Sequence, residues 1–511
     1  MRDAVVIDGH SLDLAKIERV AYEEATVAIA PEAGRRIEAS RRTIEKVLDR
    51  GTSVYGVNTG FGRFSDVVIP PEDVARLQRN LIVSHAAGVG EPFSVPVVRA
   101  MTLLRANALA LGHSGVRPVV VETLAEMLNR GVHPVVPQKG SLGASGDLAP
   151  LAHLALVALG RGEAYYQGRR VPGGETMAAA GLAPLVLEAK EGLAMINGTQ
   201  AMTAVAALTL AAAQRLLDLA DAAGALSLEA LRGVPQAFDP RLQAVRGHPG
   251  QEASARRLRG LLEGSRLVTR AGELRTQDAY ALRCMPQVHG ASRDAIGYAV
   301  GVVVREANAA TDNPLIFPDD EAIISGGNFH GQPVAIAMDL AGIALAELGS
   351  ISERRIERLV NPHLSGLPAF LTRNGGLNSG FMLAQYTAAA LVSEDKLLAS
   401  PASVDSIPSS ANQEDHVSMG TIAARKAGEI LANVQTVLAI EALCAAQGVD
   451  LVVERLPGGA GRTAAEYLGL GTRALYERVR AHVPGLDEDR VLADDIEAVR
   501  RVVTAGRDGS P

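Results

Sequence analysis

The chain has 511 residues, of which 47% are hydrophobic and 21% charged, a globular composition that excludes disorder as the main state. Its formal net charge of -7 offers no electrostatic attraction to nucleic acid or to an anionic membrane, so neither is expected as a partner. Aromatic residues make up only 3% of the chain, so Ala, Leu, Val and Ile must build the core, which suits closely packed helices.

The two cysteines and the N-terminal residues predict a soluble, cytoplasmic protein. Residues 1–9 lack the apolar core of a secretory signal. Cys284 and Cys444 lie far apart and show no metal-ligand spacing, which fits a reducing compartment. The longest apolar stretch, residues 201–213, is too short to span a bilayer and carries Thr203 and Thr209.

Residues 1–112 mix short β-branched runs with glycine-rich turns, which predicts a small α+β N-terminal domain. Residues 53–62 (SVYGVNTGFG) contain several glycines and an Asn-Thr-Gly turn, so they are expected to form a loop. A long loop in an ordered chain is often a lid or a binding segment. We therefore expect this loop to serve as a lid.

Residues 113–511 are predicted to form a large α-helical bundle domain. Apolar residues recur with a helical period in segments 199–223, 331–359, 379–400 and 418–447. Several of these segments are too apolar to face water on any side, so they should be buried within a bundle or between subunits. The predicted fold class is therefore mainly α.

The run 140–152 (GSLGASGDLAPLA) can be interpreted in two ways. As ordinary structure it is a Gly/Ser turn leading into a helix capped by Asp147, with Pro150 in the first turn. As chemistry, a tight bend would let the amide nitrogen of Gly146 attack the carbonyl carbon of Ala144. Loss of water closes a five-membered ring, and loss of the Ser145 hydroxyl leaves an exocyclic methylidene. The product, 4-methylidene-imidazol-5-one (MIO), is an electrophile that needs no external cofactor, and a following helix N-terminus would stabilise negative charge on it.

The run 140–152 and several further blocks resemble the aromatic amino acid ammonia-lyase family. The blocks occur in the family's order, and they are residues 55–62, 84–90, 196–200, 277–284, 312–314, 326–331 and 412–416. The resemblance implies a homotetrameric helical superbundle whose active sites are each assembled from several subunits. It also implies an MIO electrophile, made here from Ala144, Ser145 and Gly146, to which the substrate amine adds before a base removes the β-proton.

The resemblance also suggests which residues act on the substrate. Tyr55 corresponds to the lid tyrosine of the family, and Tyr55, Tyr280 and Glu414 all remain open as the base. Arg283 is the expected clamp for the substrate carboxylate, because its guanidinium bonds carboxylates bidentately. Gln277, Tyr280 and Arg283 recur every three residues, which predicts a common helical face, and Pro286 should end or kink that helix.

Two further residues are expected to contact the substrate or the electrophile. Asn197 is expected to contact the electrophile or the substrate carboxylate. Phe329 is expected to pack near the substrate. His289 and His330 lie in or beside the blocks without an assignable role. A metal site is not expected, because no pair of histidines has i, i+4 spacing with a nearby carboxylate.

Ser84, His85 and Glu414 bear on the choice of substrate. In the family, phenylalanine-type enzymes have Phe-Leu where this chain has Ser84-His85, tyrosine-type enzymes have His-Leu, and histidine-type enzymes have Ser-His. A carboxylate at position 414 can bond an imidazole or stabilise its charged form. The expected reaction is therefore deamination of L-histidine to trans-urocanate and ammonia. The alternatives are tyrosine deamination or an MIO-dependent aminomutase on the same fold, and a non-catalytic helical assembly protein.

Overall fold

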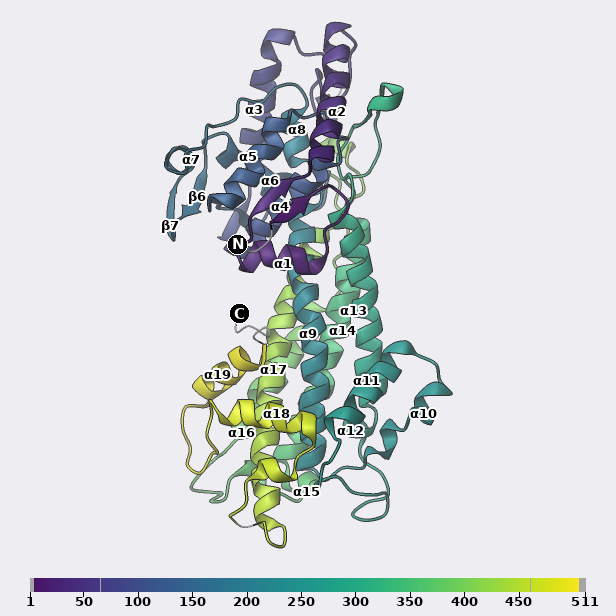
Figure 1. The fold of residues 1–511 in the computed structure, drawn as a ribbon, viewed down its shortest axis with the longest axis vertical. Helices are drawn as coiled ribbons and strands as arrows, with labels where there is room; N and C mark the ends of the chain where they lie inside the picture. Colours follow the sequence, from purple (N-terminus) through teal and green to yellow (C-terminus); the bar gives the residue numbers. More distant parts are fainter. Residues whose placement is uncertain (1–3, 65, 460, 505–511) are drawn as a thin grey trace. The chain divides into compact units, whose positions relative to one another are not determined.

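The computed structural model describes residues 4–64, 66–459 and 461–504, and most of them are helical (Figure 1). The α-helices are α1 (Leu14–Tyr22), α2 (Pro31–Asp49), α3 (Val74–His85), α4 (Val95–Ala110), α5 (Pro118–Asn129), α6 (Leu148–Ala158), α7 (Gly173–Ala179), α8 (Glu191–Ile196), α9 (Gln200–Ala230), α10 (Pro240–Ala244), α11 (Pro249–Leu261), α12 (Tyr280–Arg283), α13 (Met285–Ala307), α14 (Gln332–Val360), α15 (Pro362–Ser365), α16 (Met382–Leu398), α17 (Gly420–Arg455), α18 (Leu470–Arg480) and α19 (Leu492–Thr504). The strands are short: β1 (Val5–Ile7), β2 (Val27–Ile29), β3 (Val89–Pro92), β4 (His133–Pro134), β5 (Pro137–Lys139), β6 (Glu163–Tyr166), β7 (Arg169–Pro172), β8 (Leu315–Phe317) and β9 (Ala322–Ile324). The mainly α fold class is confirmed.

The chain forms two compact units. Unit 1 contains Met1–Ala211, Ala299–Asp339 and Pro401–Arg425, and unit 2 contains Ala212–Tyr298, Leu340–Ser400 and Lys426–Pro511. The long helices α9, α13, α14 and α17 each contribute residues to both units. The units do not divide at residue 112, where the sequence analysis separates two domains, because α5, α6 and α8 contact α2 or α3 within unit 1.

Unit 1 is organised around α4. Residues 98–110 of this helix are all buried, and α4 contacts α1, α2, α5 and strands β1 and β4. A helix that is covered on every side belongs in a core. Its two buried guanidiniums are bonded to backbone carbonyls, Arg99 to that of Val20 and Arg105 to that of Asn197. The small sheets are β1–β2 (parallel), β3–β5, β4–β6–β7 and β8–β9 (all antiparallel).

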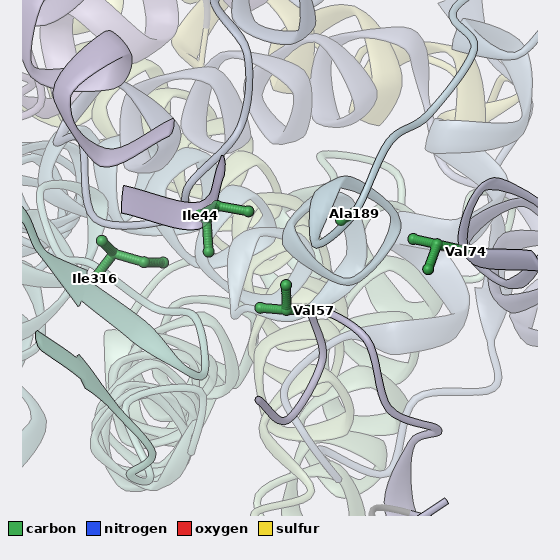
Figure 2. Close-up of a cluster of buried hydrophobic side chains, with 5 residues drawn as sticks. All are labelled: Ile44, Val57, Val74, Ala189 and Ile316. Atoms are coloured by element: carbon green, nitrogen blue, oxygen red, sulfur yellow. The ribbon is translucent and has the colours of Figure 1, made fainter. Parts of the chain in front are cut away.

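A cluster of buried aliphatic side chains anchors the glycine-rich loop in unit 1 (Figure 2). Its members are Ile44 in α2, Val57 in the loop, Val74 at the start of α3, Ala189 just before α8, and Ile316 in β8. Val57 is fully buried, whereas Tyr55, two residues earlier in the loop, is half-buried. Burial of a valine side chain contributes about 1.5–3 kcal/mol. Val57 therefore fixes the base of the loop that carries Tyr55.

Unit 2 contains a helical bundle with a buried ion pair in its core. The Glu441 carboxylate on α17 accepts two bonds from Arg355 on α14, Nε to Oε1 at 2.6 Å and Nη2 to Oε2 at 2.9 Å. The hydroxyl groups of Ser227 on α9 and Ser352 on α14 also donate to it, at 2.7 and 2.6 Å. Because every acceptor atom of Glu441 is bonded, this buried charge is compensated.

His289 belongs to the same core. Its Nδ1 lies 2.8 Å from Oδ1 of Asp221, and its Nε2 lies 3.3 Å from Nη1 of Arg355. A guanidinium can only donate, so Nε2 accepts and Nδ1 carries the proton. Burial lowers the pKa of His289, which keeps the ring neutral. His289, which had no role from sequence, is therefore a structural residue that bonds α13 to α9 and α14.

The four long helical segments expected from sequence are confirmed as α9, α14, α16 and α17. Helices α9 and α17 continue to Ala230 and Arg455, beyond their expected ends at residues 223 and 447. Gly224 does not end α9, because the helix packs there against Met285: an added Cβ would lie 2.4 Å from its sulfur. Tertiary packing thus overrides the poor helix propensity of glycine.

Three helices, α9, α14 and α17, are long and apolar enough to cross a membrane on length and composition alone. The expectation that the longest apolar stretch, residues 201–213, is too short to span a bilayer is wrong for the helices as a whole, because longer windows that contain a few polar residues are also apolar enough. Within the structure, 72%, 67% and 89% of their apolar windows are buried. Packing in the protein interior therefore covers most of this apolar surface.

Candidate active site

The chain makes a tight turn at residues 143–146. Gly143, Ser145 and Gly146 all have left-handed backbones, with φ of 84°, 50° and 76°, and Gly143 pairs with Gly146 as in an antiparallel bridge. Gly146 also forms a parallel bridge with Gly198, so close that a Cβ on Gly146 would lie 2.2 Å from the Gly198 carbonyl oxygen. Only glycine can therefore occupy position 146 without moving the neighbouring chain.

Asp147 connects this turn to two other segments. Its backbone N–H donates to the Gly198 carbonyl at 2.7 Å, and its Oδ2 accepts the N–H of Met202 in the first turn of α9 at 2.8 Å. Its Oδ1 accepts from the hydroxyl groups of Ser141, at 3.0 Å, and of Thr421. The expectation that Asp147 caps α6 is wrong: it stands at the cap position, but its side chain makes no capping bond there and bonds α9 instead. Burial raises the pKa of Asp147, and its hydrogen bonds oppose that rise.

Ser145 opens into a cavity of about 890 Å³ in unit 1, which we call the Ser145 pocket. Six predicted site residues line it: Tyr55, His85, Ser145, Asn197, Phe329 and Glu414. Ala144 and Gly146 flank Ser145 in the turn and are themselves buried. Each of the six comes from a separate stretch of sequence, so the fold of unit 1 brings them together.

Glu414 lies beside Ser145. The Ser145 hydroxyl donates to Oε1 of Glu414 at 3.3 Å, and the Ser409 hydroxyl donates to Oε2 at 2.9 Å. Ser409 and Glu414 also pair through their backbones, so residues 409–414 form a short reversed loop that presents the carboxylate to the pocket. Gly62 of the Tyr55 loop comes so close to this loop that an added Cβ would lie 2.5 Å from the Ser410 hydroxyl oxygen.

Tyr55 is half-buried at the pocket, and its ring packs edge-on against Phe61 with 6.5 Å between centroids. Burial raises the pKa of Tyr55, and the negative charges of Glu414 and Asp312 raise it further. The phenol therefore keeps its proton at neutral pH in this pocket. Phe329, also half-buried, lines the same cavity.

His85 is the last residue of α3. The Ser84 hydroxyl donates to the Leu81 carbonyl at 3.1 Å, so its oxygen accepts from Nδ1–H of His85, 3.0 Å away. Burial lowers the pKa of His85, although the Glu414 charge opposes this. The ring is therefore neutral, with Nδ1 protonated, and Nε2 is a hydrogen-bond acceptor.

Asn197 follows α8 and is almost completely buried. Its Nδ2 donates to Oδ1 of Asp312 at 3.2 Å and to the Asn313 carbonyl at 3.0 Å. Oδ2 of Asp312 in turn binds Nζ of Lys190 at 2.7 Å. Residues 312–314 are one of the blocks noted from sequence, but no role was assigned to Asp312 or to the pocket residue Asn313. Nothing in the sequence marks Lys190.

Gln277, Tyr280 and Arg283 belong to unit 2 and do not line the Ser145 pocket. Tyr280 and Arg283 lie in the short helix α12, with the guanidinium carbon 4.6 Å from the ring centroid. Tyr280 is 70% exposed. The expectation of a common helical face is wrong for Gln277, which precedes α12. The buried Asp278 accepts the N–H of Val234, and the next residue, Ala279, has an extended backbone that precedes the helix.

The structure shows where His330 lies, for which the sequence gives no role, and whether side chains gather as metal ligands. His330 stacks on His416 with 5.9 Å between ring centroids, and its Nε2 lies 3.2 Å from the His416 carbonyl oxygen. It does not line the pocket. Within residues 4–64, 66–459 and 461–504, no group of three or more His, Cys, Asp or Glu side chains is arranged to hold a metal ion.

A substitution at position 146 tests the close approach of the turn to Gly198. Gly146→Ala should destabilise the protein by about 1–3 kcal/mol more than Gly168→Ala, because its Cβ meets a backbone carbonyl. Gly168 is a matched control, since its φ of 75° is nearly the same and its surroundings are open. The unfolding temperatures of the two variants measure the difference. Equal unfolding temperatures would contradict the close contact.

The chain is similar over its length to known lyases. Residues 12–481 match the aromatic amino acid lyase family. Histidine ammonia-lyases of Alkaliphilus metalliredigens and Symbiobacterium thermophilum are each 58% identical to it, over 98% and 99% of this chain and 96% and 97% of their own lengths. Among solved structures, histidine ammonia-lyase from Trypanosoma cruzi matches with a TM-score of 0.90 at 45% identity, covering 98% of this chain and 93% of its own. Tyrosine aminomutase from Streptomyces globisporus matches with a TM-score of 0.93 at 41% identity, covering 98% and 97%. The chain belongs to the aromatic amino acid lyase family.

Proposed function

We propose that the protein is a histidine ammonia-lyase, which converts L-histidine to trans-urocanate and ammonia in the cytoplasm. One observation carries the proposal: the tight turn at Ser145 opens into a pocket that is also lined by neutral His85 and by Glu414. The histidine ammonia-lyases that match nearly the whole chain support the same substrate.

The backbone at residues 144–146 fits an MIO group made from the chain itself. Left-handed conformations at Ser145 and Gly146 compress the turn, and Gly146 has no Cβ to meet the Gly198 carbonyl. Attack of this nitrogen on the Ala144 carbonyl carbon and loss of water would close the ring. Departure of the Ser145 hydroxyl as a second water would leave the methylidene. The group would supply an electrophile for the substrate amine, so no external cofactor is required.

His85 and Glu414 are suited to an imidazole ring. Nε2 of neutral His85 can accept the N–H of the substrate imidazole, and Glu414 can bond its other nitrogen when that nitrogen is protonated. A leucine at position 85 would leave the substrate N–H without a partner. Phe329 contributes an apolar surface to the same pocket.

The base that removes the β-proton remains one of Tyr55, Tyr280 and Glu414. Because the pKa of Tyr55 is raised, its phenol is protonated in the free enzyme. To act as the base, Tyr55 would have to lose this proton when the substrate binds. Glu414 lies 3.3 Å from the Ser145 hydroxyl, close to where the substrate amine would attack. It is thus a candidate in unit 1 that bonds the turn directly.

We propose that Gln277, Tyr280 and Arg283 act on a substrate held by another copy of the chain in a homotetramer. Tyr280 is exposed, and Nε of Arg283 is buried without a hydrogen-bond partner among the described residues. Helix α14 exposes three apolar side chains, Ile336, Leu340 and Ile343, on one face, as expected for a helix that packs against another subunit.

The proposed activity is tested by following urocanate absorbance in the ultraviolet with L-histidine as the substrate. The wild-type protein should produce urocanate, and its mass should be lower than that of the encoded chain by two water molecules. Ser145→Ala should abolish turnover, and its mass should not fall by two water molecules below that of its own encoded chain, because no hydroxyl is left to leave. Turnover of L-tyrosine but not of L-histidine, or formation of a β-amino acid, would reassign the enzyme. An unchanged rate in Ser145→Ala would refute the electrophile.

His85→Leu should lower kcat/KM for L-histidine by about 10- to 100-fold, because the substrate N–H loses an acceptor worth about 1–3 kcal/mol. The unfolding temperature should stay within a few degrees of the wild type, since the His85 side chain is only partly buried. Steady-state kinetics and thermal unfolding are measured on the same preparation. A large fall in unfolding temperature with unchanged kcat/KM in the folded fraction would identify His85 as structural.

Shared active sites can be tested by complementation. Arg283→Lys and Ser145→Ala should each be nearly inactive, because lysine cannot bond a carboxylate bidentately and alanine cannot form the electrophile. When the two inactive chains are produced together, some sites of the mixed tetramers should combine wild-type Ser145 with wild-type Arg283, and part of the activity should return. Failure to recover activity in verified mixed tetramers would contradict shared sites, as would a fully active monomer.

A further inference from the structure

The orientation of the Asn197 side chain is fixed by two acceptors. Its Nδ2 donates one hydrogen to Oδ1 of Asp312 and the other to the carbonyl of Asn313. A flipped amide would place its oxygen against the Asp312 carboxylate and the Asn313 carbonyl, so three acceptors would face one another. Both amide hydrogens are thereby used, and Oδ1 is the polar atom of Asn197 that remains available.

Asp312 is held in place by a second buried charge. Nζ of Lys190 lies 2.7 Å from Oδ2 of Asp312, and the exposed fractions of the two side chains are 0% and 1%. The Asp312 Oδ1 atom also accepts the N–H of Asn313 at 2.7 Å. Transfer of a lysine and an aspartate from water to such a site is costly, and breaking the pair would leave an uncompensated buried charge. Lys190 also has a left-handed backbone, with φ of 73°. The Lys190–Asp312 pair therefore bonds the side chain of Asn197, which lines the Ser145 pocket.

Oδ1 of Asn197 is buried and has no hydrogen-bond partner among the described residues. Asn197 lines the Ser145 pocket, and the next residue, Gly198, pairs with Gly146 of the turn. An amide oxygen can only accept hydrogen bonds, so it cannot bond the carboxylate of a substrate. It can bond an amine. An unpartnered buried acceptor beside the turn thus suits the α-amine of the substrate.

We propose that Asp312, neutralised by Lys190, is a positioning residue that turns the Asn197 amide so that its Oδ1 accepts a hydrogen bond from the α-amine of the substrate. This inference rests on the proposed function, since it takes an amino acid as the ligand. It differs from the expectation from sequence, in which Asn197 contacts the electrophile or the substrate carboxylate. Asp312 itself does not touch the substrate.

The test compares ligands with and without an amine. Binding of L-histidine and of 3-(imidazol-4-yl)propionate, its analogue without the amine, is measured by calorimetry on the full-length Ser145→Ala protein, which cannot turn the substrate over. Asp312→Leu combined with Lys190→Met removes the acceptor and both charges with side chains of similar size. This variant should bind L-histidine about tenfold or more weakly, and the amine-free analogue within about threefold of the parent.

Two further variants separate positioning from a merely structural role. Asp312→Asn combined with Lys190→Met also removes both charges but retains an oxygen acceptor, so it should bind both ligands within about threefold of the parent. Glu191→Gln is the matched control: it removes a buried ion pair with Arg117 from the first residue of α8, away from the pocket. It should lower the unfolding temperature without changing the preference for the amine-bearing ligand.

Equal weakening of the two ligands in the Leu/Met variant would overturn the proposal, as would unchanged binding of L-histidine. If that variant does not fold, Asn197→Leu removes the Oδ1 acceptor proposed to bind the amine and must show the same selective loss. Wild-type turnover is measured in parallel, and its absence with L-histidine would refute the proposed function alone. In that case the comparison is repeated with L-tyrosine and 3-(4-hydroxyphenyl)propionate, which tests the role of Asp312 independently of the ring.

Discussion

The close approach of two backbone segments, at Gly146 and Gly198, is the constraint on which the rest of the site depends. The two segments pair like strands, and neither glycine leaves room for a Cβ. This contact keeps Ser145 and Gly146 in left-handed conformations and directs Ser145 into the pocket. It also places the loop between α8 and α9, with Asn197 on it, beside the turn at Ser145. One steric condition therefore sets both the shape of the proposed electrophile precursor and its distance from a group that can orient the substrate.

Around that contact, buried carboxylates fix the orientation of neighbouring groups. Asp147 ties the turn to the first turn of α9, and Asp312 ties the Asn197 amide to Lys190. Buried carboxylates are expensive unless each oxygen is bonded, so each of these side chains admits few alternative orientations. The Glu441–Arg355 pair follows the same rule in unit 2, where it joins the helices of the bundle core. In unit 1, the bonded carboxylates of Asp147 and Asp312 lie at the pocket and the turn.

Much of the fold and part of the site could be predicted from sequence. The helical period of the apolar residues located α9, α14, α16 and α17, and the run around Ser145 located the turn. Gln277 could not be placed, because the three-residue spacing that suggests a helix there is overridden by the buried Asp278. The interpretation in which Asp147 caps the following helix was wrong, since a carboxylate at a cap position does not reveal which N–H groups approach it from elsewhere. Lys190 left no signal, because only tertiary packing buries it against Asp312.

The turn draws on partners that are far apart along the chain. The Leu142 carbonyl accepts the N–H of Met419, and the Asp147 carboxylate accepts from Thr421, more than 270 residues later in the chain. During synthesis, a ribosome must therefore have added the segment around residue 420 before the compressed geometry at Ser145 can be complete. For the electrophile proposed above, dependence on these late segments would make ring closure a final step of maturation. A nascent or truncated polypeptide would then not carry a reactive alkene that could trap cellular amines and thiols.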